Sequence, residues 1–170
     1  MPNTPIKFSY EVEKDNLYAG EYPRALDEWE SKEKIKQLLD FGITAFVDLT
    51  EEGETAPYTK FLPDACTYSR HSIVDVQTPE TMNQLHEIIL EIDRLIHLGW
   101  KVYVHCLGGI DRTGVIVACW FVYQGLSPED AFQEFVQRWQ TNPKSQKVQP
   151  LIDRRWDYLD QYADWLKKRL

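Results

Sequence analysis

The 170-residue sequence predicts an α/β fold, in which a central, mostly parallel sheet is flanked by helices. Short β-rich apolar runs alternate along the chain with helical patterns, which is typical of a parallel sheet. The strand-like run 101–104 leads through Cys106 and a glycine-containing loop into the apolar run 115–123. That run is too long for a typical buried strand, so it predicts a buried helix. The composition, with 43% hydrophobic and 27% charged residues, is that of a globular protein.

The first part of the chain is predicted to form an edge hairpin, a helix and an inner strand. Residues 8–12 and 17–19 flank a short polar turn, which predicts a hairpin at one edge of the sheet. Residues 27–41 form a charged amphipathic pattern, which predicts a helix that ends at Gly42. Residues 43–49 predict the next strand. We expect the inward face of the helix to carry Trp29, Ile35, Leu38 and Leu39.

The rest of the chain continues the alternation. Residues 67–74 predict another strand, and Thr78 has the character of an N-cap, followed by a proline, for a helix over 78–98. After the buried helix, a Ser-Pro pair opens a further helix over 127–140. Residues 151–170 are predicted to form a last amphipathic helix on the flank of the sheet. A length of 170 residues favours one domain spanning residues 1–170.

Charge and cysteine content exclude several classes of protein. The net charge is −8, with a pI near 5.0, which argues against nucleic-acid partners and against anionic membranes. The start of the sequence lacks the features of a signal peptide, and no apolar run is long enough to span a membrane. Three cysteines without a secretion signal indicate a reducing compartment, so we expect a cytoplasmic protein. No Cys/His spacing predicts a metal site.

The stretch 104–114, Val-His-Cys-Leu-Gly-Gly-Ile-Asp-Arg-Thr-Gly, carries the strongest functional signal. A loop that enters a helix N-terminus presents free N–H donors and the positive end of the helix dipole, so Cys106 is expected to favour its thiolate. Arg112 offers a planar fork that suits a phosphate, and Thr113 is placed to donate its hydroxyl to the thiolate. The loop residues expected to bind the oxyanion are Leu107, Gly108, Gly109, Ile110, Asp111 and Arg112.

The run His105-Cys106-(five residues)-Arg112-Thr113-Gly114 resembles the signature loop of the cysteine-dependent protein tyrosine and dual-specificity phosphatases. The resemblance implies that Cys106 is a nucleophile that forms a phosphocysteine intermediate, that Arg112 binds phosphate and that Thr113 helps to break the intermediate. It implies neither a metal nor another cofactor. The family usually has a glycine before the arginine, where this chain has Asp111. An acidic residue there also occurs in some bacterial and lipid-directed members, which typically carry a loop lysine that this chain lacks.

Such a phosphatase also needs a general acid for the leaving oxygen and a base for the attacking water. Asp75 follows the predicted strand 67–74 and precedes a Thr-Pro pair, so we expect it on a loop at the carboxyl end of the sheet. Compact dual-specificity phosphatases are similar in having an aspartate upstream of a proline. The alternative acids are Asp48, near the end of the strand over 43–49, and Glu52 and Glu54 in the acidic stretch that follows it.

The predicted function is a metal-independent phosphomonoesterase that acts on phosphoproteins through a phosphocysteine intermediate. Phosphotyrosine is the expected substrate, and the small size of the chain favours a shallow pocket that also accepts phosphoserine or phosphothreonine. A small phosphoester is the other expected partner. Two alternatives remain open, namely a phosphoprotein-binding module with little turnover and an inositol-phosphate or lipid phosphatase. Cys66 is a candidate resolving thiol for Cys106. The oligomeric state is left open.

Overall fold

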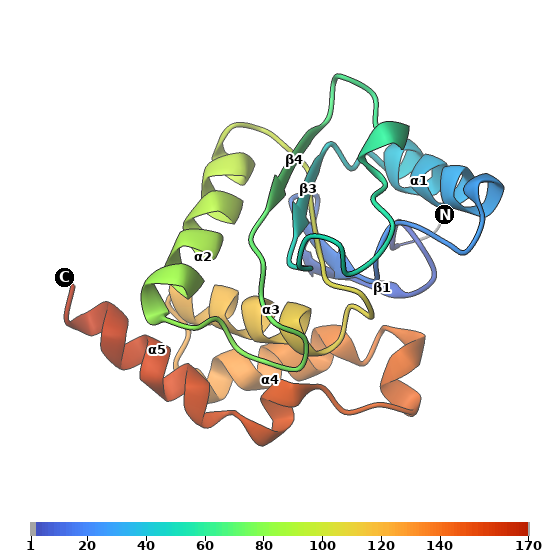
Figure 1. Cartoon of the computed structure of the whole chain (residues 1–170). Coiled ribbons are helices and arrows are strands. Elements are labelled where there is room, and N and C mark those ends of the chain that lie inside the picture. Colours follow the sequence, from blue (N-terminus) through green and yellow to red (C-terminus); the bar gives the residue numbers. More distant parts are fainter. Residues whose placement is uncertain (1–2, 170) are drawn as a thin grey trace.

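A five-stranded sheet forms the centre of the molecule (Figure 1). The computed structural model describes residues 3–169. The strands are β1 (Ser9–Glu13), β2 (Leu17–Gly20), β3 (Ala45–Asp48), β4 (Thr67–Arg70) and β5 (Val102–His105). Their order in the sheet is β1-β2-β5-β3-β4, with β1 antiparallel to β2 and all other pairs parallel. The predicted α/β class with a mostly parallel sheet is therefore confirmed, as is the hairpin at one edge.

Helices cover both faces of this sheet. They are α1 (Glu28–Phe41), α2 (Met82–His97), α3 (Asp111–Tyr123), α4 (Pro128–Trp139) and α5 (Asp157–Lys167), with short 3-10 helices at Thr59–Phe61, Pro143–Gln146 and Leu151–Arg154. Figure 1 shows α1 on one face of the sheet, α2 and α3 on the other, and α4 and α5 beyond α3. The side chains of β5 point alternately to the two faces of the sheet. Val102 and Val104 therefore join the core under α3, whereas Tyr103 joins the core under α1.

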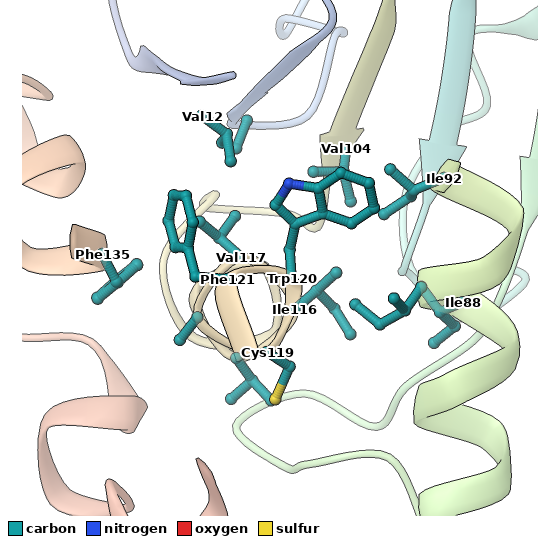
Figure 2. Close-up of a cluster of buried hydrophobic side chains, with 14 of the residues drawn as sticks. Val12, Ile88, Ile92, Val104, Ile116, Val117, Cys119, Trp120, Phe121 and Phe135 are labelled. Atoms are coloured by element: carbon teal, nitrogen blue, oxygen red, sulfur yellow. The ribbon is translucent and has the colours of Figure 1, made fainter. Parts of the chain in front are cut away.

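After its polar first turn, the helix α3 is apolar on every side, as suits a helix that the rest of the molecule encloses. In Figure 2 its side chains meet β1, β5, α2 and α4 in one cluster. The labelled residues of that cluster are Val12, Ile88, Ile92, Val104, Ile116, Val117, Cys119, Trp120, Phe121 and Phe135. A helix packed on all sides has a fixed position, and so does the loop that leads into it.

Two helix predictions in the first half of the chain require correction. The helix α1 has the predicted bounds, with Asp27 as N-cap and Gly42 as a left-handed C-cap at φ +107°. Its Trp29, however, is 72% exposed rather than inward, because only the stripe with Ile35 and Leu38 meets the sheet. The helix α2 is capped by Thr81, not Thr78, since the Thr81 side chain accepts the N–H of Gln84.

Two other elements are shorter than predicted. The strand expected over 67–74 ends at Arg70, and the following residues form the loop that carries Asp75. The last helix, expected over 151–170, is divided into the 3-10 turn Leu151–Arg154 and α5. The break falls at Arg155 and Trp156, directly after the turn in which Leu151 and Ile152 are buried against α3. Among residues 3–169, no helix combines the length and apolar character needed to cross a membrane.

Candidate active site

Four loops meet at one edge of the sheet because the parallel strands end there in register. Gly20 of β2 and Asp48 of β3 pair with His105 of β5, and Arg70 of β4 pairs with Asp48. The loops that follow these strands therefore gather around the residue after β5, which is Cys106. The carboxyl edge of a parallel sheet is the common place for a ligand site in α/β proteins.

The loop from Cys106 to Ile110 turns its carbonyl groups outward. Each of three carbonyls accepts a hydrogen bond from outside the loop: Leu107 O from the N–H of Tyr22 at 2.9 Å, Gly108 O from Lys144 Nζ at 2.8 Å, and Cys106 O with His105 Nδ1 at 3.1 Å. The hydrogen bonds among the described residues include no acceptor for the amides of 107–110. Outward carbonyls leave the amides to face an anion, as the sequence predicted for this loop.

Gly109 explains part of this geometry. Its φ is +70°, and a Cβ built there would lie 2.2 Å from the carbonyl carbon of Gly20. A side chain at 109 would therefore separate the loop from β2 as well as strain the backbone. The close approach of the two glycines places the loop directly against the end of the strand.

Cys106 is buried, with 3% of its surface exposed, at the base of this loop. The Thr113 hydroxyl donates to the sulfur, with a distance of 3.1 Å between Oγ1 and Sγ. A hydroxyl donor stabilises a thiolate, both as a resting nucleophile and as a leaving group. The structure thus brings together Cys106 and Thr113 as the sequence pattern predicted.

The guanidinium of Arg112 is buried, with two of its nitrogens hydrogen-bonded within the protein and the third without a partner among the described residues. Its end-on pair of nitrogens, Nη1 and Nη2, donates to the two carboxylate oxygens of Glu54 at 2.8 Å each. Nη1 also donates to the carbonyl of Ile73 at 3.0 Å. Nε, in contrast, is buried without a hydrogen-bond partner among the described residues. A buried donor left unpaired is costly, so the Nε–Nη2 side of the fork is the edge suited to a phosphate.

Glu54 has a position that the sequence did not predict. The spacing of an acidic stretch contains no information about which carboxylate reaches the arginine across 58 residues of chain. The Arg112 hydrogen bonds lower the pKa of Glu54, against the opposing effect of burial. For Arg112, burial acts to lower the pKa, but Glu54, Cys106 and Asp75 together outweigh it and the pKa is raised. The pair therefore stays ionised, and Glu54 serves to orient the arginine rather than to donate protons.

Asp75 is the carboxylate that remains at the mouth of the site. Its side chain is 60% exposed, and its Oδ1 lies 3.3 Å from Arg112 Nη2. It sits on the loop between β4 and α2, where Val76 adopts a left-handed φ of +59°. Its other recorded contact is local, an acceptance from the N–H of Val76 at 2.9 Å. Among the candidate acids, Asp75 thus combines proximity to the arginine with access to solvent.

Asp48 is a structural residue and not an alternative acid. It is fully buried and accepts hydrogen bonds from the Thr50 hydroxyl at 2.6 Å, the Thr50 N–H at 2.9 Å and the Tyr68 hydroxyl at 2.6 Å. Burial raises the pKa of Asp48, but His105 and these donors outweigh it and the net pKa is lowered. A carboxylate so enclosed holds the ends of β3 and β4 together and does not reach a substrate.

His105 holds the loop from its buried side. It is fully buried, with Nε2 at 2.6 Å from the Tyr58 hydroxyl and Nδ1 at 3.1 Å from Cys106 O. Burial lowers its pKa, with Asp48 opposing the shift. A neutral imidazole with both nitrogens engaged is a spacer between the sheet and the loop.

Asp111 also has a structural contact. Its Oδ1 accepts the N–H of Leu151 at 2.8 Å, which ties the 3-10 turn Leu151–Arg154 to the first turn of α3. This contact gives a structural role to the acid at a position where phosphatases with a similar signature loop usually have glycine. The Asp111 carboxylate therefore helps to hold the segment that begins at Leu151 against α3.

The structure argues against Cys66 as a resolving thiol. Cys66 precedes β4, whose first residue Thr67 is level with Val102 at the start of β5, whereas Cys106 follows the end of β5. The rise of a strand is about 3.3 Å per residue, so the two cysteines lie beyond the Cα separation of about 4.4–6.8 Å found in disulfides.

In the described part of the chain, no group of three or more His, Cys, Asp or Glu side chains is placed to hold a metal ion.

The family model for "Polymorphic toxin system, DSP-PTPase phosphatase" matches residues 24–126, which include Asp75, Cys106 and Arg112. The chain belongs to this family of dual-specificity-type protein tyrosine phosphatases. The resemblance of the signature loop is thereby confirmed.

Curated relatives and a solved structure agree with this assignment. Protein 067L of Invertebrate iridescent virus 3, which bears the name of a tyrosine phosphatase, is 33% identical over 110 residues, or 62% of this chain and 42% of its own. Protein 197R of Invertebrate iridescent virus 6, similarly named, is 31% identical over 131 residues, or 72% and 44%. The chain thus spans less than half the length of these relatives. The kinase-associated phosphatase KAP shares the fold, with a TM-score of 0.71, 20% identity and coverage of 99% and 100%.

Proposed function

We propose that the chain is a cysteine-dependent phosphomonoesterase that needs no metal and acts on phosphoproteins. The observation that supports this most strongly is the paired geometry of nucleophile and arginine. The Cys106 sulfur accepts from Thr113 at the base of a loop with free amides, and Arg112 keeps an unpaired, buried Nε. A tetrahedral oxyanion satisfies the loop amides and this Nε together.

The reaction proceeds in two steps. In the first, the Cys106 thiolate attacks phosphorus in line with the leaving oxygen, while the loop amides and Arg112 bind the three equatorial oxygens. The P–O bond breaks and Asp75 gives its proton to the leaving oxygen, which leaves a phosphocysteine. In the second step Asp75, now a carboxylate, removes a proton from water, which attacks phosphorus and releases Cys106 as a thiolate held by the Thr113 hydroxyl.

The proposed substrate is a phosphotyrosyl protein, with phosphoserine and phosphothreonine accepted as well. Apolar side chains at the rim support this breadth, since Val74, Val76 and Leu107 are 50%, 50% and 45% exposed. They offer contact to a substrate without closing the site, so short phosphoamino acids can reach Cys106. Three peptides that differ only in phosphotyrosine, phosphoserine or phosphothreonine test the breadth, and turnover of phosphotyrosine alone contradicts it.

We also propose a reducing compartment such as the cytosol. The three cysteines are all free, and the catalytic role of Cys106 requires a reduced sulfur. Reversible inactivation of the purified protein by mild oxidant, with recovery in reductant, is the result expected.

The experiment that tests the function is hydrolysis of p-nitrophenyl phosphate with reductant and chelator present, in the wild type and in Cys106→Ser. Turnover in the wild type that is lost in Cys106→Ser supports the proposal. The matched control is Cys66→Ser, at the opposite end of the sheet, which should keep full activity. Absence of wild-type turnover, or turnover that survives in Cys106→Ser or needs a metal, contradicts it. Tight phosphopeptide binding without hydrolysis would indicate the binding module instead.

A further inference from the structure

A polar groove of about 560 Å³ adjoins the mouth of the candidate active site. It lies between the loop that follows β4 and the start of α2. Its lining includes Glu51, Ser72, Val74, Gln77, Glu80 and Gln84. The groove uses none of the side chains assigned above to the reaction.

The groove is continuous with the site through the backbone. Ile73 lines the groove and, through its carbonyl, accepts a hydrogen bond from Arg112 Nη1 at 3.0 Å. Val74, the next lining residue, directly precedes Asp75. A residue that flanks the phosphorylated side chain of a bound peptide therefore enters this groove when the phosphate occupies the loop.

The groove is held in shape before any substrate binds. Gln84 spans it with two hydrogen bonds, from Nε2 to the carbonyl of Ser72 at 3.0 Å and from the N–H of Glu80 to Oε1 at 2.8 Å. These bonds fix the segment before α2 relative to the end of the β4 loop. A preformed groove loses little conformational entropy on binding.

The charge of the groove is negative and uncompensated. Its only ionisable side chains are Glu51 and Glu80, both exposed and without an ion pair among the described residues. Cations near the loop 106–110 are already paired with other carboxylates: Arg112 with Glu54, Arg70 with Asp48 and Lys144 with Glu21.

We propose that this groove is a specificity subsite for a lysine or arginine side chain adjacent to the phosphorylated residue. The aliphatic stem of such a side chain packs on Val74, which is half exposed, and its cationic head lies between Glu51 and Glu80. The inference rests on the proposed function and narrows its substrates to phosphoproteins with basic flanking residues.

The test compares four phosphotyrosine peptides of one length. One has neutral flanks, one has arginine on the N-terminal side, one has arginine on the C-terminal side, and one has glutamate on both sides. We expect arginine on at least one side to raise kcat/KM by about three- to tenfold, mainly through KM, since partly exposed ion pairs contribute modestly. The preference should fall at about 1 M salt, where the Debye length is about 3 Å.

Substitution of the two groove glutamates tests whether the groove causes the preference for arginine. In the double variant Glu51→Gln, Glu80→Gln the arginine preference should fall to about one, with p-nitrophenyl phosphate turnover and melting temperature unchanged. The matched control is Glu33→Gln, a charge removed from the exposed side of α1, which should keep the preference. Equal kcat/KM for the four peptides, or a preference that survives in the double variant, overturns the subsite. If either result is found while the wild type still hydrolyses p-nitrophenyl phosphate, only the subsite is wrong. If the wild type does not hydrolyse p-nitrophenyl phosphate, the proposed function itself is contradicted.

Discussion

The two halves of the candidate active site differ in how firmly they are held. Cys106 and Arg112 are 3% and 1% exposed, on a loop fixed by three outward carbonyls and a helix enclosed by the core. Asp75 is 60% exposed, on a loop with a left-handed residue and a single ion pair to Arg112. The half proposed to bind phosphate is thus preformed, and the half proposed to transfer protons is open. This division suits a reaction in which phosphate is constant while the leaving group and then water must enter.

The largest effect should come from the preformed half. Replacing Arg112 with lysine keeps the positive charge but removes the fork, so both the Glu54 pair and the Nε–Nη2 edge are lost. We expect kcat/KM for p-nitrophenyl phosphate to fall by about 10³-fold, the upper range for loss of an oxyanion donor. Steady-state kinetics give the measurement. The control is Arg24→Lys, whose guanidinium donates to Pro57 O at the surface, and equal losses in both variants would contradict the assignment.

A smaller effect, dependent on the leaving group, should come from the open half. In Asp75→Asn the mouth keeps its shape but the carboxyl cannot supply a proton. We expect kcat for a phosphotyrosine peptide to fall by about 10²-fold or more, as is typical of a lost general acid. The loss should be smaller for p-nitrophenyl phosphate, because p-nitrophenolate leaves without protonation.

The control for this prediction is Asp64→Asn, an exposed aspartate in the turn before β4. It should leave both substrates unaffected. Equal losses for the two substrates in Asp75→Asn would show that the residue shapes the mouth rather than protonating the leaving group. Full activity of Asp75→Asn would remove it from the mechanism.

The preformed half was also the half that the sequence could predict. Cys106, Arg112 and Thr113 lie within eight positions on one strand–loop–helix unit, so local spacing determines their relative placement. The α/β class followed from the alternation of elements for the same reason. Gly109 was predicted as one of the loop residues that bind the oxyanion, and its close approach to the backbone of Gly20 is visible in the structure alone.

The parts that sequence reasoning missed depend on long-range contacts. Glu54 reaches Arg112 from another strand's loop, Asp111 reaches Leu151, and Lys144 reaches Gly108. No periodicity or spacing encodes such a meeting. The outward placement of Trp29 failed for a related reason, since an amphipathic pattern predicts that a stripe is buried but not where the sheet ends beneath it.

Glu54 offers a way to sharpen the contrast, because it belongs to an exposed loop but orients the buried arginine. In Glu54→Gln the amide keeps one acceptor and loses the charge, so Arg112 is held less firmly. We expect kcat to fall by about tenfold, the equivalent of one charge-assisted hydrogen bond, with little change in melting temperature. Glu54→Asp should recover part of the loss.

The control for Glu54→Gln is Glu52→Gln on the same loop. Glu52 is exposed, so this variant should leave kcat unchanged. A tenfold loss in that variant too would mean that the charge of the loop, and not the contact with Arg112, is what matters. Unchanged kcat in Glu54→Gln would show that the arginine is held in place without it.

The smallest effect expected is the dependence of the free energy of unfolding on pH. Burial lowers the pKa of His71, His86 and His105 below the ordinary value of 6.5. As the pH falls through 6.5, the unfolded chain takes up protons on these histidines that the folded chain does not. The free energy of unfolding must therefore decrease on acidification from about pH 7.5 to about pH 5.5. Urea denaturation at a series of pH values measures the slope, and a constant or rising free energy would contradict it.

The carboxylates respond at lower pH. The folded-state pKa values of Glu54 and Asp48 lie below the ordinary values of 4.5 and 3.8, so their stabilisation is complete above those values and is lost as the pH falls through the lowered ones. Mild acid should therefore weaken the fold through its histidines while the Arg112–Glu54 pair stays ionised. Replacing His86 with glutamine should reduce the slope without altering turnover, because His86 lies on α2 and contacts Tyr162 of α5 rather than the loop 106–110. An unchanged slope would assign the acid sensitivity to His71 and His105.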